Sequence, residues 1–171
     1  MKKINLIFFF IILTNFAYAE GKVVYLDVNY LLSESAVGKY VNSNLKKISD
    51  DNNEVYKNFE AELKSDEEKL LTQQNILKKE DYEKKLSELR NKFKSYQEKK
   101  NDKNKELNLL RNNAGNKILK SINEIMTEYS KKNSISLVIT KQSIIIGKTE
   151  LDVTNDILEL LNKKITKLEL N

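Results

Sequence analysis

Apolar residues recur at helical spacing through residues 38–132, a highly charged stretch that contains no proline. In the first half of this stretch the apolar residues are three or four positions apart, and polar residues occupy some positions of this repeat. From Asn52 onward the pattern has a period of about eleven residues, roughly 3.67 per turn, which keeps the stripe on one face of a nearly straight helix. This first stripe comprises Val41, Leu45, Ile48, Asn52, Val55, Phe59, Leu63, Asp66, Leu70, Gln74 and Leu77.

A second narrow stripe follows and comprises Tyr82, Leu86, Leu89, Phe93, Tyr96, Lys100, Lys103, Leu107, Leu110, Ala114, Ile118, Ile122, Ile125 and Tyr129. Folding the second helix back on the first covers both stripes, so the pattern predicts a helical hairpin with its turn within residues 75–79. Glu80 and Asp81 would then complement the positive end of the returning helix. A helix of about 40 residues is about 60 Å long, so the hairpin projects as an arm. Because no glycine or proline marks the turn, a single unbroken helix is the alternative.

The two ends of the chain have the patterns of short strands and caps. Residues 22–28 are rich in β-branched and aromatic residues, which predicts a strand, and Asp27 or Asn29 then caps a short helical turn. Residues 134–140 and 143–147 predict the two strands of a β-hairpin. Asp152 is the expected N-cap of a final amphipathic helix with the apolar residues Ile157, Leu158, Leu160, Leu161, Ile165 and Leu168.

These elements predict an α+β fold that is mainly α, in which a long helical hairpin projects from a small β body. Residues 38–132 form the coiled-coil-like arm, and residues 20–37 and 133–171 form the body, because the hairpin returns the chain to where it left. Three short strands with open edges are marginal alone, so we expect several chains to share one core. Polar residues at seam positions predict places where the arm bends, namely Asn52, Asp66, Lys100 and Lys103.

Residues 1–19 have the pattern of a cleaved signal peptide. Lys2 and Lys3 precede an unbroken apolar run at residues 6–13, and residues 17–19 are small-x-small, as a signal peptidase requires. The run is shorter than the roughly 20 apolar residues that span a bilayer. We therefore expect cleavage after Ala19 and export of the mature chain, with a retained membrane anchor as the alternative.

Composition removes several classes of function. The chain contains no cysteine and no histidine, so it lacks thiol chemistry and the commonest general base and metal ligand. We therefore expect no enzyme, no cofactor and no metal site. Cleavage of the signal would lower the net charge from +5 to about +3, and the interleaved acidic residues argue against nucleic acid as a partner.

The distribution of charge is more informative than its total. Residues 46–68 hold four basic and eight acidic residues, whereas residues 90–105 hold seven basic and two acidic residues. This predicts an arm that is acidic near its base and basic toward its tip, where it would attract acidic proteins or anionic lipid surfaces in a salt-dependent way. The alternative is a solvated helix surface with i,i+4 ion pairs.

Short motifs in a fixed order around the arm resemble the Skp/OmpH family of periplasmic chaperones. The motifs are residues 24–32 (VYLDVNYLL) with Ser35, Gly38 and Lys39, residues 135–139 (ISLVI) and residues 152–158 (DVTNDIL). The resemblance implies a homotrimer in which three arms hang from a shared β-barrel body. It also implies an ATP-independent holdase in the periplasm that binds unfolded outer-membrane β-barrel proteins, prevents their aggregation and aids their delivery to the outer membrane. The lipopolysaccharide site proposed in the family does not carry over, since the matching residues 107–111 read LNLLR.

The resemblance suggests two groups of candidate residues. For the trimer body we expect Val24, Leu26, Leu137, Ile139, Ile144 and Ile146, and whether Val23, Tyr25 and Ile145 face outward is left open. For client contact we expect Phe59, Leu70, Leu77, Tyr82, Phe93 and Tyr96 with Lys92, Lys94, Lys99 and Lys100. Hairpin core is the alternative for the apolar arm residues, because side chains at seam spacing usually pack on the partner helix.

Two other classes of protein share some of these features. A structural coiled-coil spacer between envelope layers would have the arm, but it would not need the strand-forming ends. A protein that binds anionic lipid or lipopolysaccharide surfaces would use the lysine-rich part of the arm. The strand-forming ends favour the chaperone over the spacer.

Overall fold

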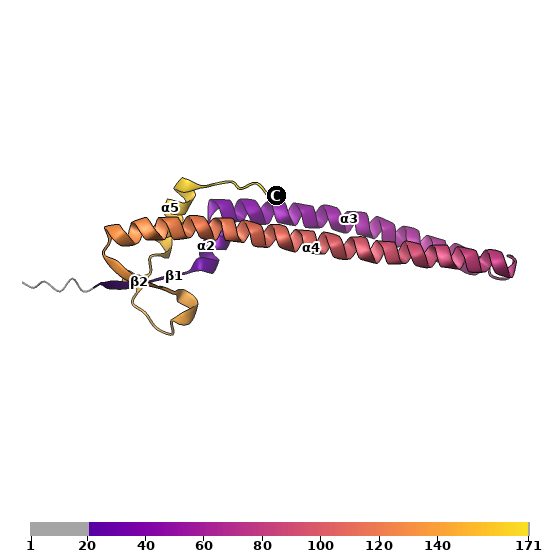
Figure 1. Ribbon diagram of the computed structural model, residues 1–171, viewed down its shortest axis with the longest axis horizontal. Coiled ribbons are helices and arrows are strands. Elements are labelled where there is room, and N and C mark those ends of the chain that lie inside the picture. The colour runs from indigo at the N-terminus through magenta and orange to yellow at the C-terminus, as the bar shows by residue number, and fades with distance from the viewer. Residues whose placement is uncertain (1–20, 171) are drawn as a thin grey trace, which may run out of the picture.

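The structure is a computed structural model that describes residues 21–170. The expected signal peptide at residues 1–19 lies outside the described residues. Within residues 21–170, no helix combines the length and the apolarity that crossing a membrane requires. The elements in chain order are β1 (Lys22–Leu26), α2 (Val28–Glu34), α3 (Ala36–Thr72), α4 (Lys79–Lys132), β2 (Ile135–Thr140), the 3-10 turns η2 (Lys141–Ser143) and η3 (Thr149–Leu151), and α5 (Thr154–Lys164) (Figure 1).

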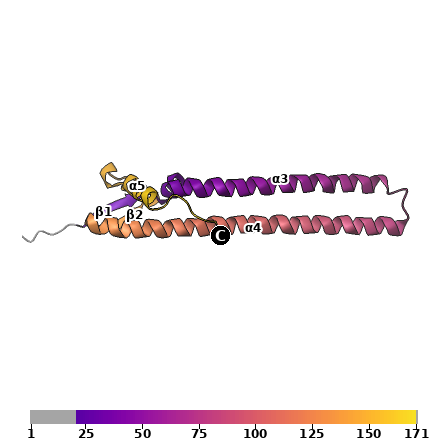
Figure 2. The ribbon, with the colours of Figure 1, turned by 90° about the horizontal axis from the view of Figure 1, so that it is seen from above.

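The predicted helical hairpin is present, and the fold is mainly α as expected. Helices α3 and α4 lie side by side and antiparallel, and they project far beyond the other elements (Figures 1 and 2). With 37 and 54 residues they are roughly 55 Å and 80 Å long. The turn between them occupies residues 73–78, about two residues earlier than predicted, and the alternative of one unbroken helix is wrong.

Local sequence explains where the arm helices begin and end. The Ser35 hydroxyl accepts a hydrogen bond from the Gly38 N–H at 3.1 Å and so caps α3. Gly38 is required there, because a Cβ at this position would lie 2.2 Å from the Leu32 carbonyl oxygen. Helix α4 has no side-chain cap, but Glu80 and Asp81 occupy its first turn, as predicted, and complement its dipole.

The β body differs from the prediction in one respect. Strand β2 pairs with β1 in parallel, with Val24 opposite Val138 and Tyr25 opposite Ile139. The expected β-hairpin between residues 134–140 and 143–147 is wrong, since residues 144–148 are in no strand. A parallel pair needs a long crossover, and the arm supplies it by returning the chain beside β1. The side chains of Ile145 and Ile146 are 104% and 91% exposed, so that segment has no apolar cover within residues 21–170.

The main hydrophobic core lies where the base of the arm meets the body. It is built from β1, α2, both arm helices and α5, and it comprises Val24, Leu26, Leu31, Val37, Val41, Leu45, Ala114, Ile118, Ile122, Ile125, Met126, Val153, Ile157 and Leu161. The start of α5 is tied to the end of β1, because the Asp27 N–H donates to the Thr154 hydroxyl at 2.9 Å. The N-cap of α5 is Val153, so the prediction of Asp152 is wrong by one residue. The Asp152 carboxylate nevertheless accepts a hydrogen bond from the Thr154 N–H at 3.0 Å.

Candidate functional site

The middle of the arm has its own small core, separate from the core of the body. Tyr56, Leu63 and Tyr96 are buried there, with Phe59 and Leu89 packed against them. Asn52 is half-buried and Lys103 exposed in the stretch between this mid-arm cluster and the main core. The arm is therefore held together by two apolar clusters with a polar interval between them.

The seam differs from the predicted stripe at residues 55 and 56. Val55 is 63% exposed, whereas its neighbour Tyr56 is 8% exposed and packs against α4. The seam residue after Asn52 thus comes four positions later instead of three, a step that lets a straight helix stay in register with its partner. At this position the Tyr56 ring also makes an edge-on contact with the Tyr96 ring, and the two ring centroids are 6.1 Å apart.

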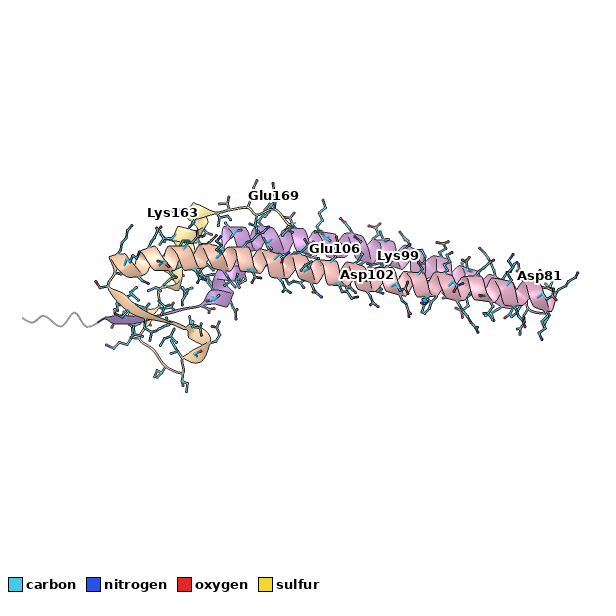
Figure 3. The ribbon with its side chains drawn as sticks, viewed as in Figure 1. Asp81, Lys99, Asp102, Glu106, Lys163 and Glu169 are labelled. Carbon is cyan, nitrogen blue, oxygen red and sulfur yellow. The ribbon has the colours of Figure 1, made fainter. Side chains whose placement is uncertain are left out.

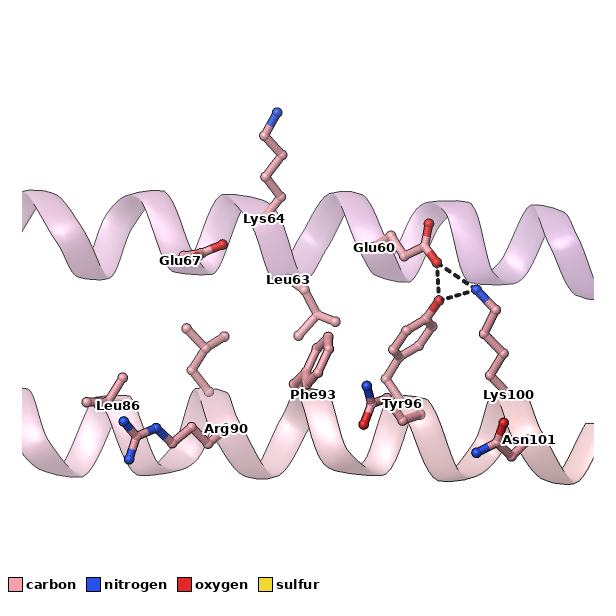
Figure 4. A pocket seen from close by; sticks show the side chains of 12 residues that line it. Glu60, Leu63, Lys64, Glu67, Leu86, Arg90, Phe93, Tyr96, Lys100 and Asn101 are labelled. Carbon is pink, nitrogen blue, oxygen red and sulfur yellow. Dashed lines mark hydrogen bonds and ion pairs between the residues drawn. The ribbon is translucent and has the colours of Figure 1, made fainter.

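Aromatic rings and charges are combined in the mid-arm cluster. Phe59 stacks on Tyr96 with ring centroids 5.5 Å apart. The Tyr96 hydroxyl donates to the Glu60 carboxylate and accepts a hydrogen bond from Lys100 Nζ at 2.9 Å, and Lys100 also pairs with Glu60 at 3.0 Å (Figure 4). The Lys100 ammonium lies 5.5 Å from the centre of the Tyr56 ring, a cation–π contact.

The same contacts shift the pKa values of the charged groups. Hydrogen bonds from Tyr96 and then from Lys100 lower the pKa of the Glu60 carboxyl below its ordinary value of 4.5. The bonds to Tyr96 and Glu60 raise the pKa of Lys100. Closer to the tip, Lys92 bridges Glu62 at 2.6 Å and Asp66 at 2.7 Å, and its hydrogen bond lowers the pKa of the Asp66 carboxyl. Glu60, Glu62 and Asp66 of α3 are thus each paired with a lysine of α4.

The predicted basic tip is wrong. Residues 90–105 lie in the middle of α4, opposite the acidic part of α3, and the tip is formed by residues 73–78. An antiparallel hairpin places residues at equal distances from the turn beside each other, so the acidic and basic runs face each other, and Lys92 and Lys100 pair with Glu60, Glu62 and Asp66 across the seam. The seam residues Asp66 and Lys100, where we expected bends, are engaged in these cross-helix pairs.

Two open grooves flank the mid-arm cluster, one on each side of the seam. The Phe93 groove has a volume of about 1000 Å³ and is lined by Glu60, Leu63, Lys64, Glu67, Leu86, Leu89, Arg90, Phe93, Tyr96, Gln97, Lys100 and Asn101 (Figure 4). The Val55 groove has a volume of about 540 Å³ and is lined by Asn52, Val55, Tyr56, Phe59, Tyr96, Lys99, Asp102, Lys103 and Glu106. Figure 3 shows Lys99, Asp102 and Glu106 along this part of the arm, among the charged side chains that cover both helices. Each groove therefore has an apolar floor and a charged rim.

The Tyr56 hydroxyl is an unused polar group next to the Val55 groove. It is buried and has no hydrogen-bond partner among the described residues. A buried hydroxyl without a partner costs about 1–3 kcal/mol. Sequence reasoning did not single out Tyr56 or its neighbour Glu60, although the facing acidic and basic runs, equally far from the turn, were a usable signal for the cross-helix contacts.

The expected client-contact residues differ in how exposed they are. Leu70 and Tyr96 are buried on the seam, as the hairpin-core alternative describes, and Phe59, Leu77, Tyr82, Lys92 and Lys100 are half-buried. Phe93 is 48% exposed in the Phe93 groove, and Lys94 and Lys99 are exposed. Phe93, Lys94 and Lys99 are thus the members of this group that are most accessible to a ligand.

The expected trimer-body residues are also divided. Val24 and Leu26 are buried in the core of the chain itself, and Ile139 and Ile144 are half-buried. Leu137 and Ile146 are exposed. Of the positions left open, Val23 and Ile145 face outward, whereas Tyr25 is buried and its hydroxyl donates to the Lys148 carbonyl at 3.2 Å. The body therefore exposes the apolar residues Val23, Leu137, Ile145 and Ile146, of which Val23 and Leu137 lie opposite each other in the sheet.

Comparisons with known proteins agree with this fold. A family model described as outer membrane protein (OmpH-like) matches residues 22–161. A crystal structure of an OmpH-like protein from Caulobacter crescentus, described as a candidate outer membrane chaperone, superposes with a TM-score of 0.80 and 18% sequence identity, over 88% of this chain and 89% of that chain. At that identity the likeness shows a shared fold. A search of curated proteins finds no match.

Proposed function

Since the chain belongs to the OmpH-like family of outer membrane proteins, we propose that it is a chaperone of the periplasm. In this proposal it is an ATP-independent holdase, which binds unfolded outer-membrane β-barrel proteins, prevents their aggregation and aids their delivery to the outer membrane. The observation that carries the proposal is the arm itself, a long hairpin with an apolar-floored groove on each side. The predicted signal peptide would direct export and would be removed by cleavage after Ala19.

The grooves suit a client that has no fixed structure. Both are shallow and open, so they offer many weak contacts rather than one enclosed pocket. Strands of membrane β-barrels alternate apolar and polar residues and are only moderately apolar as segments. Such a strand can place its apolar side chains on the groove floor and leave its polar ones among the charges of the rim. Several weak sites on one molecule hold a client firmly while each contact is still easily released.

We also propose that the chain works as a homotrimer assembled through its body. A two-stranded sheet is marginal by itself, and both strands expose apolar residues, Val23 on β1 and Leu137 on β2. Exposed strand edges and apolar surface of this kind invite pairing with further copies of the chain. Three arms around a common body would enclose a cavity and multiply the number of grooves.

The test of the holdase is light scattering. A urea-unfolded outer-membrane β-barrel protein is diluted into buffer with and without the purified mature chain, at low and at high salt. We expect suppression of scattering near one oligomer per client. Because the acidic and basic runs of the arm face each other, we expect little loss of suppression at high salt. No suppression at either salt concentration contradicts the chaperone and leaves a structural envelope spacer as the better account.

The test of the trimer is sedimentation velocity on the mature chain and on its Ile146→Asp variant. A charge at this exposed apolar position should dissociate the assembly without unfolding the chain. The matched control is Leu109→Asp on the outer face of α4, which is also exposed and should leave the oligomer intact. A monomeric wild-type chain at micromolar concentration contradicts this part of the proposal.

One observation favours a second binding surface, for lipid, at the tip of the arm. Ile76 in the turn is 80% exposed, Leu71 beside it is also exposed, and Lys78 and Lys79 follow. Flotation with vesicles that contain anionic phospholipid tests it, and an Ile76→Glu variant should lose the binding. Equal flotation of both proteins, or none of the wild type, contradicts a lipid-contacting tip.

A further inference from the structure

The C-terminal tail, residues 165–170, does not continue the last helix. Ile165 has φ −148° and ψ 129°, which is extended backbone, and the residues after it belong to no helix or strand. Figure 1 shows the tail leaving α5 and running beside α3 toward the tip of the arm, and Figure 2 shows it crossing over the space between α3 and α4. The tail therefore lies along the base of the arm.

The end of the tail alternates half-buried and exposed side chains. Leu168 and Leu170 are half-buried and pack against the main core, whereas Thr166, Lys167 and Glu169 are exposed. Together with one face of α3 the tail lines an open hollow of about 390 Å³, whose helix side is formed by Tyr40, Asn44, Lys47, Ile48 and Asp51. An extended segment with leucines two positions apart thus already lies along this face of the arm.

The attachment of the tail is apolar and limited. The hydrogen bond from the Ile165 N–H to the Leu161 carbonyl, at 2.9 Å, and the Lys164–Glu124 ion pair, at 2.7 Å, both lie at its start. Beyond them, no hydrogen bond or ion pair within residues 21–170 holds residues 166–170. A segment fixed by two half-buried side chains opens far more readily than the core on which it lies.

The hollow beside the tail and the Val55 groove follow one another along α3. Asn44, Ile48, Asp51 and Val55 are four, three and four residues apart, so they lie on one face of α3. The tail lines the hollow on this face as far as Asp51, and the Val55 groove begins at Asn52. We call this stretch of the arm, from Tyr40 to Phe59, the track; the tail lies beside its base, and its outer half is open.

We propose that this track binds extended segments with alternating apolar side chains, and that the tail is a built-in occupant of its base which a client strand displaces. The partner is an unfolded strand of an outer-membrane β-barrel, whose alternation matches that of the tail. The identity of the partner rests on the proposed function, but the recognition of the tail by the track does not. Displacement of the tail would extend the stretch of α3 that is open to a client strand from residues 52–59 to residues 40–59.

The first experiment tests the track without any client. The probe is a fluorescein-labelled peptide of residues 162–170, and fluorescence anisotropy measures its binding to three full-length proteins. In Leu168→Asn/Leu170→Asn the tail is released; in the matched control Thr166→Asn/Glu169→Gln only exposed tail positions change. The wild-type chain is the third protein.

We expect the released-tail variant to bind the peptide at least about tenfold more tightly than the wild type and the control, because apparent affinity scales with the fraction of open sites. A peptide with asparagine at both leucine positions should not bind. Equal affinity for all three proteins, or no binding to the released-tail variant, overturns the proposal. Circular dichroism of that variant should match the wild type, since the tail lies outside the helices.

The second experiment tests displacement. The chain has no cysteine, so spin labels can be placed at Asp51→Cys and Glu169→Cys, both exposed positions at the two sides of the hollow beside the tail. Pulsed electron paramagnetic resonance should give a short distance in the free protein, and a longer, broader one when a urea-unfolded β-barrel client is bound.

The outcomes separate this proposal from the proposed function. Suppressed aggregation with an unchanged label distance means that the tail is a fixed strap, which overturns the displacement and leaves the chaperone standing. If the chain does not suppress aggregation, the chaperone fails, and the peptide experiment alone decides whether the track recognises its tail.

Discussion

The base and the middle of the arm are parts of the same two helices, yet they are held together in different ways. At the base, Ile118 and Ile122 of α4 are fully buried among the apolar residues of β1, α2 and α5. In the middle, Tyr56, Leu63 and Tyr96 form the buried cluster, and aromatic and ionic contacts surround them. The base packs against several elements, whereas within residues 21–170 the middle of each arm helix packs only against the other arm helix. The comparison predicts that the base is the more stable part of the arm and that the middle opens more readily.

The largest expected effect belongs to the base. Leu161→Ala removes a fully buried side chain of α5 and should lower the free energy of unfolding by about 2–5 kcal/mol. Leu160→Ala is the matched control, because the adjacent leucine is 38% exposed and should cost below about 1 kcal/mol. Urea unfolding followed by circular dichroism measures both. Equal losses of unfolding free energy in the two variants would mean that the buried side of α5 is no more tightly packed than its exposed side. That result would contradict a well-packed base of the arm.

An intermediate effect is expected for the two buried tyrosines of the middle. Tyr96→Phe removes the hydroxyl that links Glu60 to Lys100 and should cost about 1 kcal/mol. Tyr56→Phe removes a hydroxyl that has no partner within residues 21–170, so it should be neutral or stabilising. Hydrogen exchange should show the loss from Tyr96→Phe in the middle of the arm and not in β1 or α5. A loss of the same size from both substitutions would contradict the contacts described above.

The smallest effect is a dependence on pH. The folded arm lowers the pKa values of Glu60 and Asp66, so their contribution to stability is complete above their ordinary pKa values and is lost as the pH falls through the lowered ones. Amide exchange in the middle of the arm, corrected for its intrinsic pH dependence, should therefore quicken slightly below pH 4.5.

Glu60→Gln should weaken this dependence, whereas Glu67→Gln should not, because Glu67 is exposed and makes no ion pair within the described residues. If amide exchange depends on pH in the same way in Glu60→Gln as in the wild type, the ionic contacts of Glu60 do not stabilise the middle of the arm.

Much of the fold could be predicted from the sequence, because the signals that specify a helix involve residues that are close together in the chain. The two apolar stripes, the capping residue Asp27 and the acidic first turn of α4 all depend on residues within a few positions of one another. The candidate site was harder to predict. The seam could not be assigned to Tyr56 rather than Val55 from one helix alone, since the choice depends on which ring of α4 lies opposite.

The errors have a common cause. Residues 143–147 have the composition of a strand, but a strand needs a partner, and the arm brings β1 rather than this segment beside β2. The run of lysines at residues 90–105 resembles a basic surface until the register of the hairpin places Glu60, Glu62 and Asp66 across from it. In both cases we inferred a structural role from a local pattern, although that role depends on residues that are distant in the sequence.

By itself, then, the sequence determined the two long helices, the strands β1 and β2, and the absence of thiol and imidazole chemistry, because these follow from local spacing and composition. The tertiary structure decided the parallel pairing of the strands, the ion pairs between the two arm helices, the two grooves and the position of the tail. Those features join residues 26 to more than 100 positions apart in the chain, and their contacts depend on a register that is set by the turn at the tip. A periodic pattern specifies which face of a helix is apolar, but it does not specify what that face meets.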